Sequence, residues 1–539
     1  MIETNIISIK DISNFVLDKI YKETKNNTIN LSSQIYDFHI SSLGILRILG
    51  EIEDTYGINL EIYDYVENES LSSFCKLIFH KVNDLEEEQE KDDYFLVRDN
   101  ENEEFDLTNV QMAYLSGRET AFELGNTSTH AYIELECELD IMKLQYSLNK
   151  VIERQSMLRA VIKPNGKQKI LKSVPSFEIH INDISKLSSL EQKNKILYER
   201  NKASHKTFDP YVWPLFEFKA LKLDSNKYRL FFGIDMLIAD GASIQLLFKE
   251  ISTIYNSKEN SIEPLEISYK DYLLAYKKIK QSSKYQEDKR FWLNKVGNFP
   301  DPPSLPLKEN LRSVEKPRFK RLKKVLDEKS WSELLKICSD NNLRPSMLFL
   351  IIYSKVLVKW SNKNDLAINT TLFNRRAIHK QVNEIIGDFT EIMIFDVCFD
   401  YSENFWNDAK RIQNNFFESL AHNTFDGIEF TREYSKINNL TNGKAVFPVV
   451  FTSMLFDEEL NHLNSFGLFK DSISQTSQVY LDHQVIQLGD GVMLSWDYVS
   501  ELFEENVIES MFNDYVAIIE NLLANNQFSY PSHSNLERV

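Results

Sequence analysis

The sequence predicts an α/β fold of two lobes, preceded by a small all-helical unit. Three observations predict this organisation. The chain has 539 residues, which is too long for one hydrophobic core. A run rich in like charge over residues 83–104 separates a short first part from a long second part. Strand-like and helix-like segments interleave in the second part, as they do in α/β folds.

The first 82 residues have helical periodicity. Residues 7–25 form one amphipathic stretch, and a second stretch begins near Ser42, where apolar residues recur every three positions. Gly57 suits the C-terminus of that second helix, and a shorter helix is predicted over residues 71–81. We therefore expect a helical domain over residues 1–82.

Residues 83–104 are predicted to be a linker. Acidic side chains dominate this run, and such a composition cannot bury enough apolar surface to offset its ordering entropy. A new domain is therefore expected to begin at residue 105.

The second part of the chain contains both kinds of element. Strands are predicted at residues 132–137, 228–234, 446–452 and 493–496. Helices are predicted at residues 142–155, 243–255, 271–280, 346–360, 406–420 and 507–523. The Pro-rich segment 299–307 is expected to be a loop, because Pro fits neither a helix interior nor a strand ladder.

The charge and hydropathy of the chain exclude two classes of partner. The formal net charge is -18, and an acidic surface repels phosphate backbones and anionic lipid, so we expect neither nucleic acid nor membrane as a partner. The longest apolar run, residues 347–353, is far shorter than the roughly 20 residues that a membrane span needs. The N-terminus also lacks the pattern of a secretory signal.

The cysteine pattern predicts a reducing compartment. Cys75, Cys137, Cys338 and Cys398 lie far apart and form no CxxC pair, so neither a disulfide framework nor a zinc site is expected. No His, Cys and Asp cluster has ligand spacing, so no metal is expected either. We expect a cytoplasmic protein.

The segment FFGIDMLIADGAS at residues 231–243 combines a strand, a turn and a helix start. A structural interpretation covers most of it, because Asp240 begins a turn and Ser243 makes a good helix N-cap. Asp235 favours a chemical interpretation, because a carboxylate beside apolar strand residues needs a partner such as Arg or has a shifted pKa. The residues alone leave both interpretations open.

The spacing DxxxxDxxS in this segment resembles the signature of heterocyclization domains. These are relatives of the condensation domains of nonribosomal peptide synthetases, which have HHxxxDG at the same place, whereas residues 236–239 here contain no His. Further segments match the family's motifs in chain order: FDLTNVQMAYLSGR at 105–118, RQSMLR at 154–159, the loop 299–307, residues 344–360, IGDFT at 386–390, FPVVFTSML at 447–455, and SQTSQVYLD at 474–482 with Trp496-Asp497 beyond. An ordered set of this extent makes the resemblance specific.

Three positions depart from the family pattern. Gln155 stands where His is usual, Glu391 where a small polar residue is commoner, and Ser477 where Pro is usual.

The resemblance implies a fold. It is a V-shaped pseudo-dimer of two chloramphenicol-acetyltransferase-like lobes around a central tunnel, which two carrier domains approach from opposite ends. We expect the N-lobe over residues 105–270, the C-lobe over residues 271–528 and a tail over residues 529–539.

The resemblance also implies an activity. The family joins an acyl thioester to the amine of a carrier-bound Cys, Ser or Thr, and then closes the side chain onto the new amide with loss of water, giving a thiazoline or oxazoline. Ring closure needs a base for the thiol or hydroxyl and an acid for the leaving oxygen, and one carboxyl with a pKa near working pH can serve as both. By the resemblance, this carboxyl is Asp482, and Thr452 hydrogen-bonds it or the intermediate. The alternatives are a solvated Asp at a strand end and a β-branched residue that favours a strand.

Other polar residues of the motifs are expected to support the site. A buried Asp235 paired with Arg would hold the loop that lines the tunnel, and Asp240 is expected to be architectural too. Asn374 either faces the tunnel or makes a turn. His483 is tempting as a base, but neighbouring side chains on a strand point to opposite faces, which disfavours that role.

Residues 38–60, FHISSLGILRILGEIEDTYGINL, resemble acyl and peptidyl carrier domains. Ser42 aligns with the serine that takes 4'-phosphopantetheine, and a helix N-terminus suits a phosphodiester. Ser41 stands where Asp is usual and His39 where Gly is usual, so the alternative is that Ser42 is only an N-cap. A carrier in first position suggests a loading carrier.

Two rival functions stay open at this stage. One is a condensation-only domain that forms an amide or ester, and the other is a non-catalytic module that docks carriers. Donor and acceptor carriers, adenylation domains and other synthetase modules are the expected partners. The sequence chooses neither the acyl donor nor Cys over Ser or Thr, and it does not separate a free-standing subunit from a piece of a longer synthetase.

Overall fold

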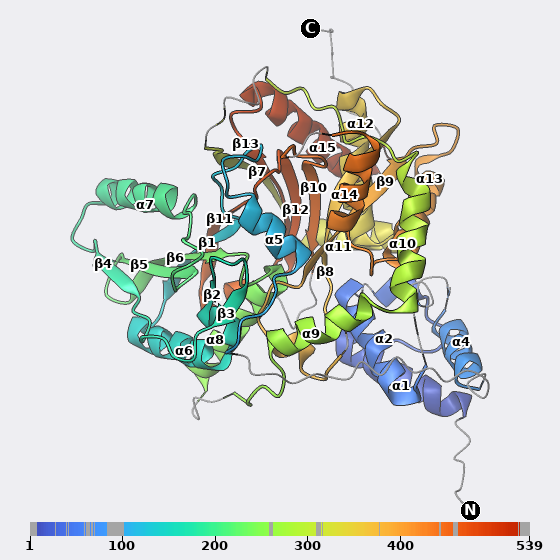
Figure 1. Ribbon diagram of the computed structural model, residues 1–539, viewed down its shortest axis with the longest axis horizontal. Coiled ribbons are helices and arrows are strands. Elements are labelled where there is room, and N and C mark those ends of the chain that lie inside the picture. Colours follow the sequence, from blue (N-terminus) through green and yellow to red (C-terminus); the bar gives the residue numbers. More distant parts are fainter. Residues whose placement is uncertain are drawn as a thin grey trace, which may run out of the picture.

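Figure 1 shows the computed structural model, in which a small helical unit lies beside two larger lobes. The structure describes residues 8–26, 28–38, 40, 42–58, 60, 65, 68, 70–83, 102–257, 262–308, 314, 316–376, 378–440, 443–455, 462–525 and 528. Most of the predicted linker and the whole of the predicted tail lie outside these residues.

The N-terminal unit is helical, as predicted. Its described elements are α1 (Ile9–Thr24), a 3-10 turn (Ile35–Phe38), α2 (Ser42–Tyr56) and α4 (Leu71–Asn83). Ser8 and Asp11 form a capping box that begins α1, because each side chain satisfies the backbone N–H of the other. The apolar faces of the three helices meet in a small core of their own.

The first lobe is built on a five-stranded sheet with the order β11-β1-β6-β5-β4. Its strands are β1 (His130–Glu138), β4 (His180–Asp183), β5 (Phe216–Lys222), β6 (Lys227–Asp235) and β11 (Leu468–Gln475). Helices α6 (Ile141–Arg154) and α8 (Gly241–Asn256) pack on one face, and α7 (Ser189–Ala203) packs on the other (Figure 1). The short hairpin of β2 (Ala160–Ile162) and β3 (Gln168–Ile170) stands apart from this sheet.

The second lobe is built on a six-stranded sheet with the order β7-β13-β12-β10-β8-β9. Its strands are β7 (Phe319–Leu326), β8 (Asp365–Phe373), β9 (Thr390–Cys398), β10 (Val449–Met454), β12 (Leu481–Leu488) and β13 (Gly491–Val499). The surrounding helices are α10 (Ser283–Val296), α11 (Glu328–Asp340), α12 (Pro345–Ser361), α13 (Phe405–Leu420), α14 (Gly427–Ile437) and α15 (Glu505–Asn525). Helix α9 (Tyr269–Ile279) instead packs Tyr269 and Tyr272 into the core of the first lobe.

Helix α12 is the central helix of the second lobe. Pro345 occupies its first turn, where a missing N–H costs nothing, and Met347 through Val358 are all buried. This all-round burial explains why the helix is apolar on every face. No helix among the described residues is both long and apolar enough to cross a bilayer.

The chain does not divide between the lobes at a single point. Strand β11 comes late in the sequence, yet it pairs antiparallel with β1 at the edge of the first sheet. The loop before β9 also packs into the core of the first lobe through Ile386 and Phe389. In that loop, a Cβ at Gly387 would lie 2.2 Å from the Tyr269 ring, so only glycine allows this approach. Two returning segments therefore interlock the lobes.

The N-terminal unit packs against the second lobe. Phe417 and Leu420 of α13 belong to the same hydrophobic cluster as the core of the unit. The buried Arg344, just before α12, donates from Nη1 to the carbonyl oxygen of Ile40 at 2.9 Å, and its guanidinium lies over the Tyr65 ring. The contact is therefore both apolar and hydrogen-bonded.

Two of the differences from the sequence-based boundaries have a clear local cause. The N-cap of α8 is Asp240, whose side chain accepts from the backbone N–H of Ser243, so the expectation that Ser243 is the N-cap was wrong. Strand β10 begins at Val449 and not at residue 446, because Pro448 has no N–H to give to a ladder.

Candidate active site

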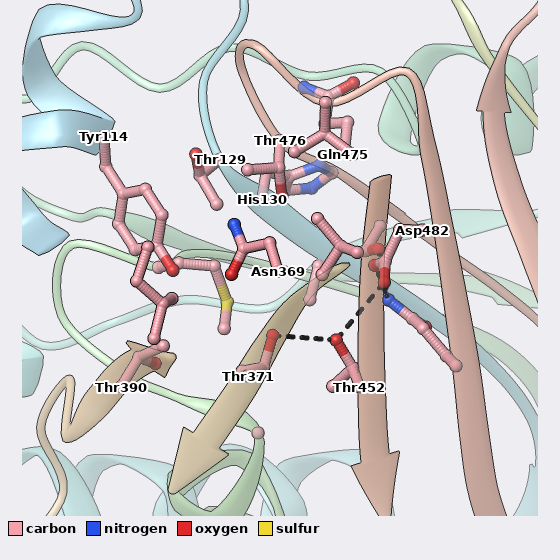
Figure 2. Close-up of a pocket in the computed structure, with 18 of the residues that line it drawn as sticks. Tyr114, Thr129, His130, Asn369, Thr371, Thr390, Thr452, Gln475, Thr476 and Asp482 are labelled. Atoms are coloured by element: carbon pink, nitrogen blue, oxygen red, sulfur yellow. Dashed lines mark hydrogen bonds between the residues drawn. The ribbon is translucent and has the colours of Figure 1, made fainter. Parts of the chain in front are cut away.

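A cavity of about 280 Å³ lies between the two lobes. Its lining side chains come from both sheets and from α5 (Asn109–Ser116), and they include Tyr114, Thr129, His130, Asn369, Thr371, Thr390, Thr452 and Asp482 (Figure 2). The lining is mostly apolar with a few convergent polar groups, which is the usual composition of a small-molecule site.

Asp482 and Thr452 reach this cavity because of strand alternation. Strand β10 lies between β8 and β12 and runs parallel to both, with Thr371, Thr452 and Gln484 in register. Successive side chains of a strand point to opposite faces, so Asp482 and Gln484 share the face that lines the cavity.

The carboxyl of Asp482 is held by two donors. Thr452 donates from Oγ1 to Oδ1 at 3.2 Å, and Gln484 donates from Nε2 to Oδ2 at 2.6 Å. The hydroxyl oxygens of Thr452 and Thr371 lie 3.0 Å apart and share a hydrogen bond (Figure 2). The arrangement fixes the orientation of the carboxyl toward the cavity.

Burial raises the pKa of Asp482 to about 6. The nearby carboxylate of Asp497 contributes to this rise, while the hydrogen bonds from Gln484 and Thr452 and the charge of Arg321 oppose it. A carboxyl with this pKa exchanges its proton near neutral pH, as a group that acts in turn as base and acid must.

A charged network holds Gln484, which in turn donates to Asp482. Arg321 on β7 makes a bidentate pair with Asp497 at 2.6 and 2.5 Å, and it donates to Gln484 Oε1 at 2.8 Å. Gln484 thereby has its oxygen engaged and its amide nitrogen directed at Asp482 and at Ser474. Arg321 and Gln484 lie outside the sequence motifs and were not predicted, although Gln484 stands two residues from Asp482 on the same strand.

His483 points away from the cavity. Its ring nitrogens bond to the Ser495 carbonyl oxygen and the Tyr515 hydroxyl at 3.1 and 2.7 Å, and burial lowers its pKa to about 3. This matches the expectation that it lies on the opposite face from Asp482.

Asp235 has the Arg partner that its position predicted. Its Oδ2 accepts from Arg118 Nη2 at 2.5 Å, and its Oδ1 accepts from the backbone N–H of Leu237 at 3.0 Å. The pair ties the end of α5 to the end of β6, beside the cavity.

Asp240 and Ser243 fasten the start of α8 to the loop before β9. Asp240 accepts from the backbone N–H of Phe389 at 3.2 Å, and the Ser243 hydroxyl donates to the Gly387 carbonyl oxygen at 2.7 Å. Arg375 donates to both Asp240 and Ser243, at 3.4 and 2.8 Å. Neither side chain lines the large cavity.

Asn374 lines a second, smaller cavity of about 40 Å³ rather than the large one. Its amide donates to Glu391 Oε2 at 2.6 Å, and Arg376 also pairs with Glu391. The unusual Glu391 therefore has two partners beside the active cavity.

The other two departures from the family pattern are also accommodated. Gln155 donates to Glu250 and to the Glu384 carbonyl oxygen at 2.8 Å each, and it accepts from the Ile386 N–H. Ser477 packs onto Gly117, where a Cβ would lie 1.9 Å from the serine Oγ. Both residues hold motif segments together.

Ser42 is the first residue of α2, as the carrier resemblance predicts. A 15-residue helix that begins there places the serine at the positive end of the helix dipole, which suits a phosphodiester of phosphopantetheine. His39, Ser41 and the side chain of Ser42 lie outside the described part of the structure.

Two lobes, each built on its own sheet, enclose one cavity, as the motif resemblance implies. The chain belongs to the condensation domain family, whose model matches residues 101–531. The phosphopantetheine attachment site family matches residues 15–78, so the N-terminal unit is a carrier-type domain with a site for 4'-phosphopantetheine. The chain is thus a condensation domain of nonribosomal peptide synthesis, preceded by a carrier-type domain.

Similar proteins belong to the same class. The chain is 35% identical over 496 residues to bacitracin synthase 1 of Bacillus licheniformis, covering 90% of this chain and 9% of that protein. It is 27% identical over 424 residues to phenyloxazoline synthase MbtB of a Mycobacterium species, covering 78% of this chain and 35% of that one. Among solved structures, the EpoB cyclization-docking bidomain of Sorangium cellulosum aligns with a TM-score of 0.75 and 28% identity, covering 96% of this chain and 98% of that one. The chain spans a minor part of the two synthetases.

Proposed function

We propose that the chain is a heterocyclization enzyme. It condenses a carrier-bound acyl group with a carrier-bound Cys, Ser or Thr and then closes the product to a thiazoline or oxazoline. One observation carries the proposal: the buried carboxyl of Asp482, with a pKa near 6, faces the cavity between the lobes and is held by Thr452. The names of the phenyloxazoline synthase and the cyclization bidomain support it.

The proton steps follow from the position of Asp482. Its carboxylate takes the proton of the substrate thiol or hydroxyl while that atom forms a bond to the amide carbon. The protonated carboxyl then gives this proton to the alkoxide oxygen, which makes a carbinol. The carboxylate next takes the proton of the ring nitrogen and passes it to the carbinol oxygen. The bond from that oxygen to carbon breaks as the C=N bond forms, so one water leaves and Asp482 ends as the carboxylate. Thr452 orients the carboxyl through its hydrogen bond.

Asp235, Asp240, Ser243 and Asn374 have supporting roles in this proposal. They fix α5, α8 and the loop before β9 around the cavity through the bonds described above. Residues 105–270 and 271–528 form the two lobes, with β11 returning to the first, and residues 1–82 form the carrier, joined through residues 83–104.

We also propose Ser42 as the residue that carries 4'-phosphopantetheine. When bound, this group supplies a flexible arm with a terminal thiol that holds the acyl group as a thioester. The chain's own contribution is a helix start at Ser42. Treatment with coenzyme A and a phosphopantetheinyl transferase is expected to add one phosphopantetheine mass to the protein and none to Ser42→Ala; an added mass on Ser42→Ala would exclude Ser42.

The cyclization proposal is tested by product mass. The unaltered protein is given an acyl-loaded donor carrier and an acceptor carrier loaded with Cys, Ser or Thr, and the acceptor thioester is analysed by mass spectrometry. A product lighter by one water than the plain amide supports cyclization. Plain amide alone would show a condensation-only enzyme, and binding of both carriers without any product would show a docking module.

A further inference from the structure

Four polar atoms on the cavity wall have no hydrogen-bond partner among the described residues. They are Thr129 Oγ1, both ring nitrogens of His130, and Asn369 Oδ1. Thr129 and His130 are 3% and 0% exposed, and the three side chains line the large cavity. Figure 2 shows them between Tyr114 and Asp482. A buried polar group without a partner costs free energy, so a cluster of them at a cavity points to a ligand that completes their bonds.

The three side chains line the cavity from two different lobes, each built on its own sheet. His130 begins β1, between Asp235 of β6 and Gln475 of β11, and its ring lies 5.7 Å from that of Phe208. Asn369 lies in β8, which is hydrogen-bonded to β9 and β10. The first lobe thus contributes Thr129 and His130, and the second lobe contributes Asn369.

The chemistry of these atoms defines the group that they can bind. Burial and the positive charges around it lower the pKa of His130 to about 3, so the ring is neutral and one nitrogen donates while the other accepts. The Thr129 hydroxyl can also donate, and Asn369 Oδ1 only accepts. A secondary amide has one acceptor and one donor on opposite sides, which matches donors on one wall and an acceptor on the other.

We propose that Thr129, His130 and Asn369 form a binding site for the amide that the condensation step creates. Asn369 Oδ1 accepts the amide N–H, while His130 and Thr129 donate to a carbonyl oxygen of the same substrate. The three are positioning residues that hold the linear amide in the cavity that also contains Asp482. This inference rests on the proposed function, because it assigns the substrate group that the ring-closing site holds.

The test measures binding without turnover. The probe is N-acetyl-alanyl-pantetheine, whose alanine has no nucleophile and cannot cyclize. The second ligand is O-acetyl-lactyl-pantetheine, in which an ester oxygen replaces the amide N–H. The third ligand is pantetheine alone. Calorimetry on the unaltered protein is expected to show an affinity for the amide at least about five-fold higher than for the ester.

Variants assign the contact to each wall of the cavity. Asn369→Leu is expected to abolish the preference for amide over ester, whereas Thr129→Val and His130→Phe weaken both probes about equally and keep the preference. Thr370→Val is the matched control, because the Thr370 hydroxyl bonds to the Met393 carbonyl oxygen and the residue does not line the cavity. Thr129→Val and His130→Phe are expected to keep or raise the melting temperature, since they remove a buried polar group without a partner.

Three results would overturn the inference. The first is equal affinity for amide and ester in the unaltered protein. The second is a loss of pantetheine binding in Asn369→Leu that equals the loss of amide binding. The third is a lower melting temperature with unchanged affinity in Thr129→Val and His130→Phe. The second result would assign the site to an amide of the pantetheine arm. A preference for the amide in a protein that forms no ring would instead contradict the proposed function and leave this site standing.

Discussion

The carboxyl of Asp482 has a raised pKa because of where it lies. It is buried near a second carboxylate, Asp497, and the two donors that hold it offset only part of the cost of its charge. The same features that suit proton transfer therefore make the ionised carboxyl unfavourable for folding.

The first prediction concerns the pH dependence of ring closure. The step begins with the carboxylate, so the rate with a serine-derived linear amide is expected to rise about tenfold per pH unit below pH 6 and to level off above it. Serine is used because its hydroxyl does not titrate in this range. Single-turnover kinetics from pH 5 to pH 8 check this, and a flat profile of the unaltered protein would contradict it. Asp490→Val is the control, because Asp490 is exposed and its replacement should leave the profile as it is.

The second prediction concerns stability. The folded-state pKa of Asp482 lies above its ordinary value of 3.8, so the folded protein binds the proton more tightly, and this stabilisation is lost as pH rises through about 6. Asn does not titrate, and it can accept from Gln484 and donate to Thr452. We therefore compare the free energy of unfolding of Asp482→Asn with that of the unaltered protein. This difference is expected to shift in favour of the variant by up to about 3 kcal/mol from pH 4 to pH 7. Urea unfolding at both pH values measures this, and an equal difference at the two values would contradict it.

At the residue scale, the sequence predicts site residues only where they belong to a motif. Asp482, Thr452 and Asp235 could be selected because they stand at fixed places in ordered motifs. Thr129, His130 and Asn369 could not, because single polar residues at strand positions have no sequence pattern that separates a cavity wall from a solvent face.

At the scale of elements, buried ion pairs connect segments that packing alone would leave loose. Arg118 at the end of α5 and Asp235 at the end of β6 have side chains that are 10% and 0% exposed. Removing one partner of such a pair strands a buried charge.

The third prediction follows from this pair. Asp235→Asn is expected to lower the free energy of unfolding by about 3–5 kcal/mol, because it leaves Arg118 without its counter-charge. Glu153→Gln is the control, because it removes one partner of the exposed pair between Lys150 and Glu153, and should change stability by less than about 0.5 kcal/mol. Chemical unfolding of both variants measures these changes, and equal losses of free energy would refute the claim that the Arg118–Asp235 pair stabilises the fold.

Periodicity predicted strands β1, β6, β10 and β13 and helices α6, α8, α9, α12, α13 and α15 of the two lobes. The other described strands and helices of the lobes, and the connections, were not predicted. Helices such as α6 and α13 have one apolar face and were found within a residue or two of their bounds. The return of β11 to the first sheet was not foreseen, because strand pairing between distant segments leaves no local pattern.

At the scale of the whole molecule, the contacts join three bodies, and two of these, the lobes, enclose one cavity. Strand β11 and the loop before β9 interlock the lobes, and the N-terminal unit rests on α13 and Arg344. The carrier-type unit is therefore attached to the second lobe by more than its linker.

The fourth prediction tests this attachment. Arg344→Leu removes the bond to the Ile40 carbonyl oxygen and is expected to increase amide hydrogen exchange in α1, α2 and α4 while leaving the two sheets unchanged. Lys329→Leu, at an exposed position of α11, is the matched control. Unchanged exchange in the three helices would mean that the apolar contact with α13 alone holds the unit.

Ring closure by Asp482 is tested most directly by supplying the linear amide on an acceptor carrier and following its mass. We predict that the unaltered protein removes one water from it, whereas Asp482→Asn leaves the linear amide unchanged yet still forms it from separate acyl and Cys carriers. Loss of water at the same rate in Asp482→Asn would contradict the role of Asp482. A linear amide that persists with the unaltered protein for Cys, Ser and Thr alike would contradict heterocyclization itself.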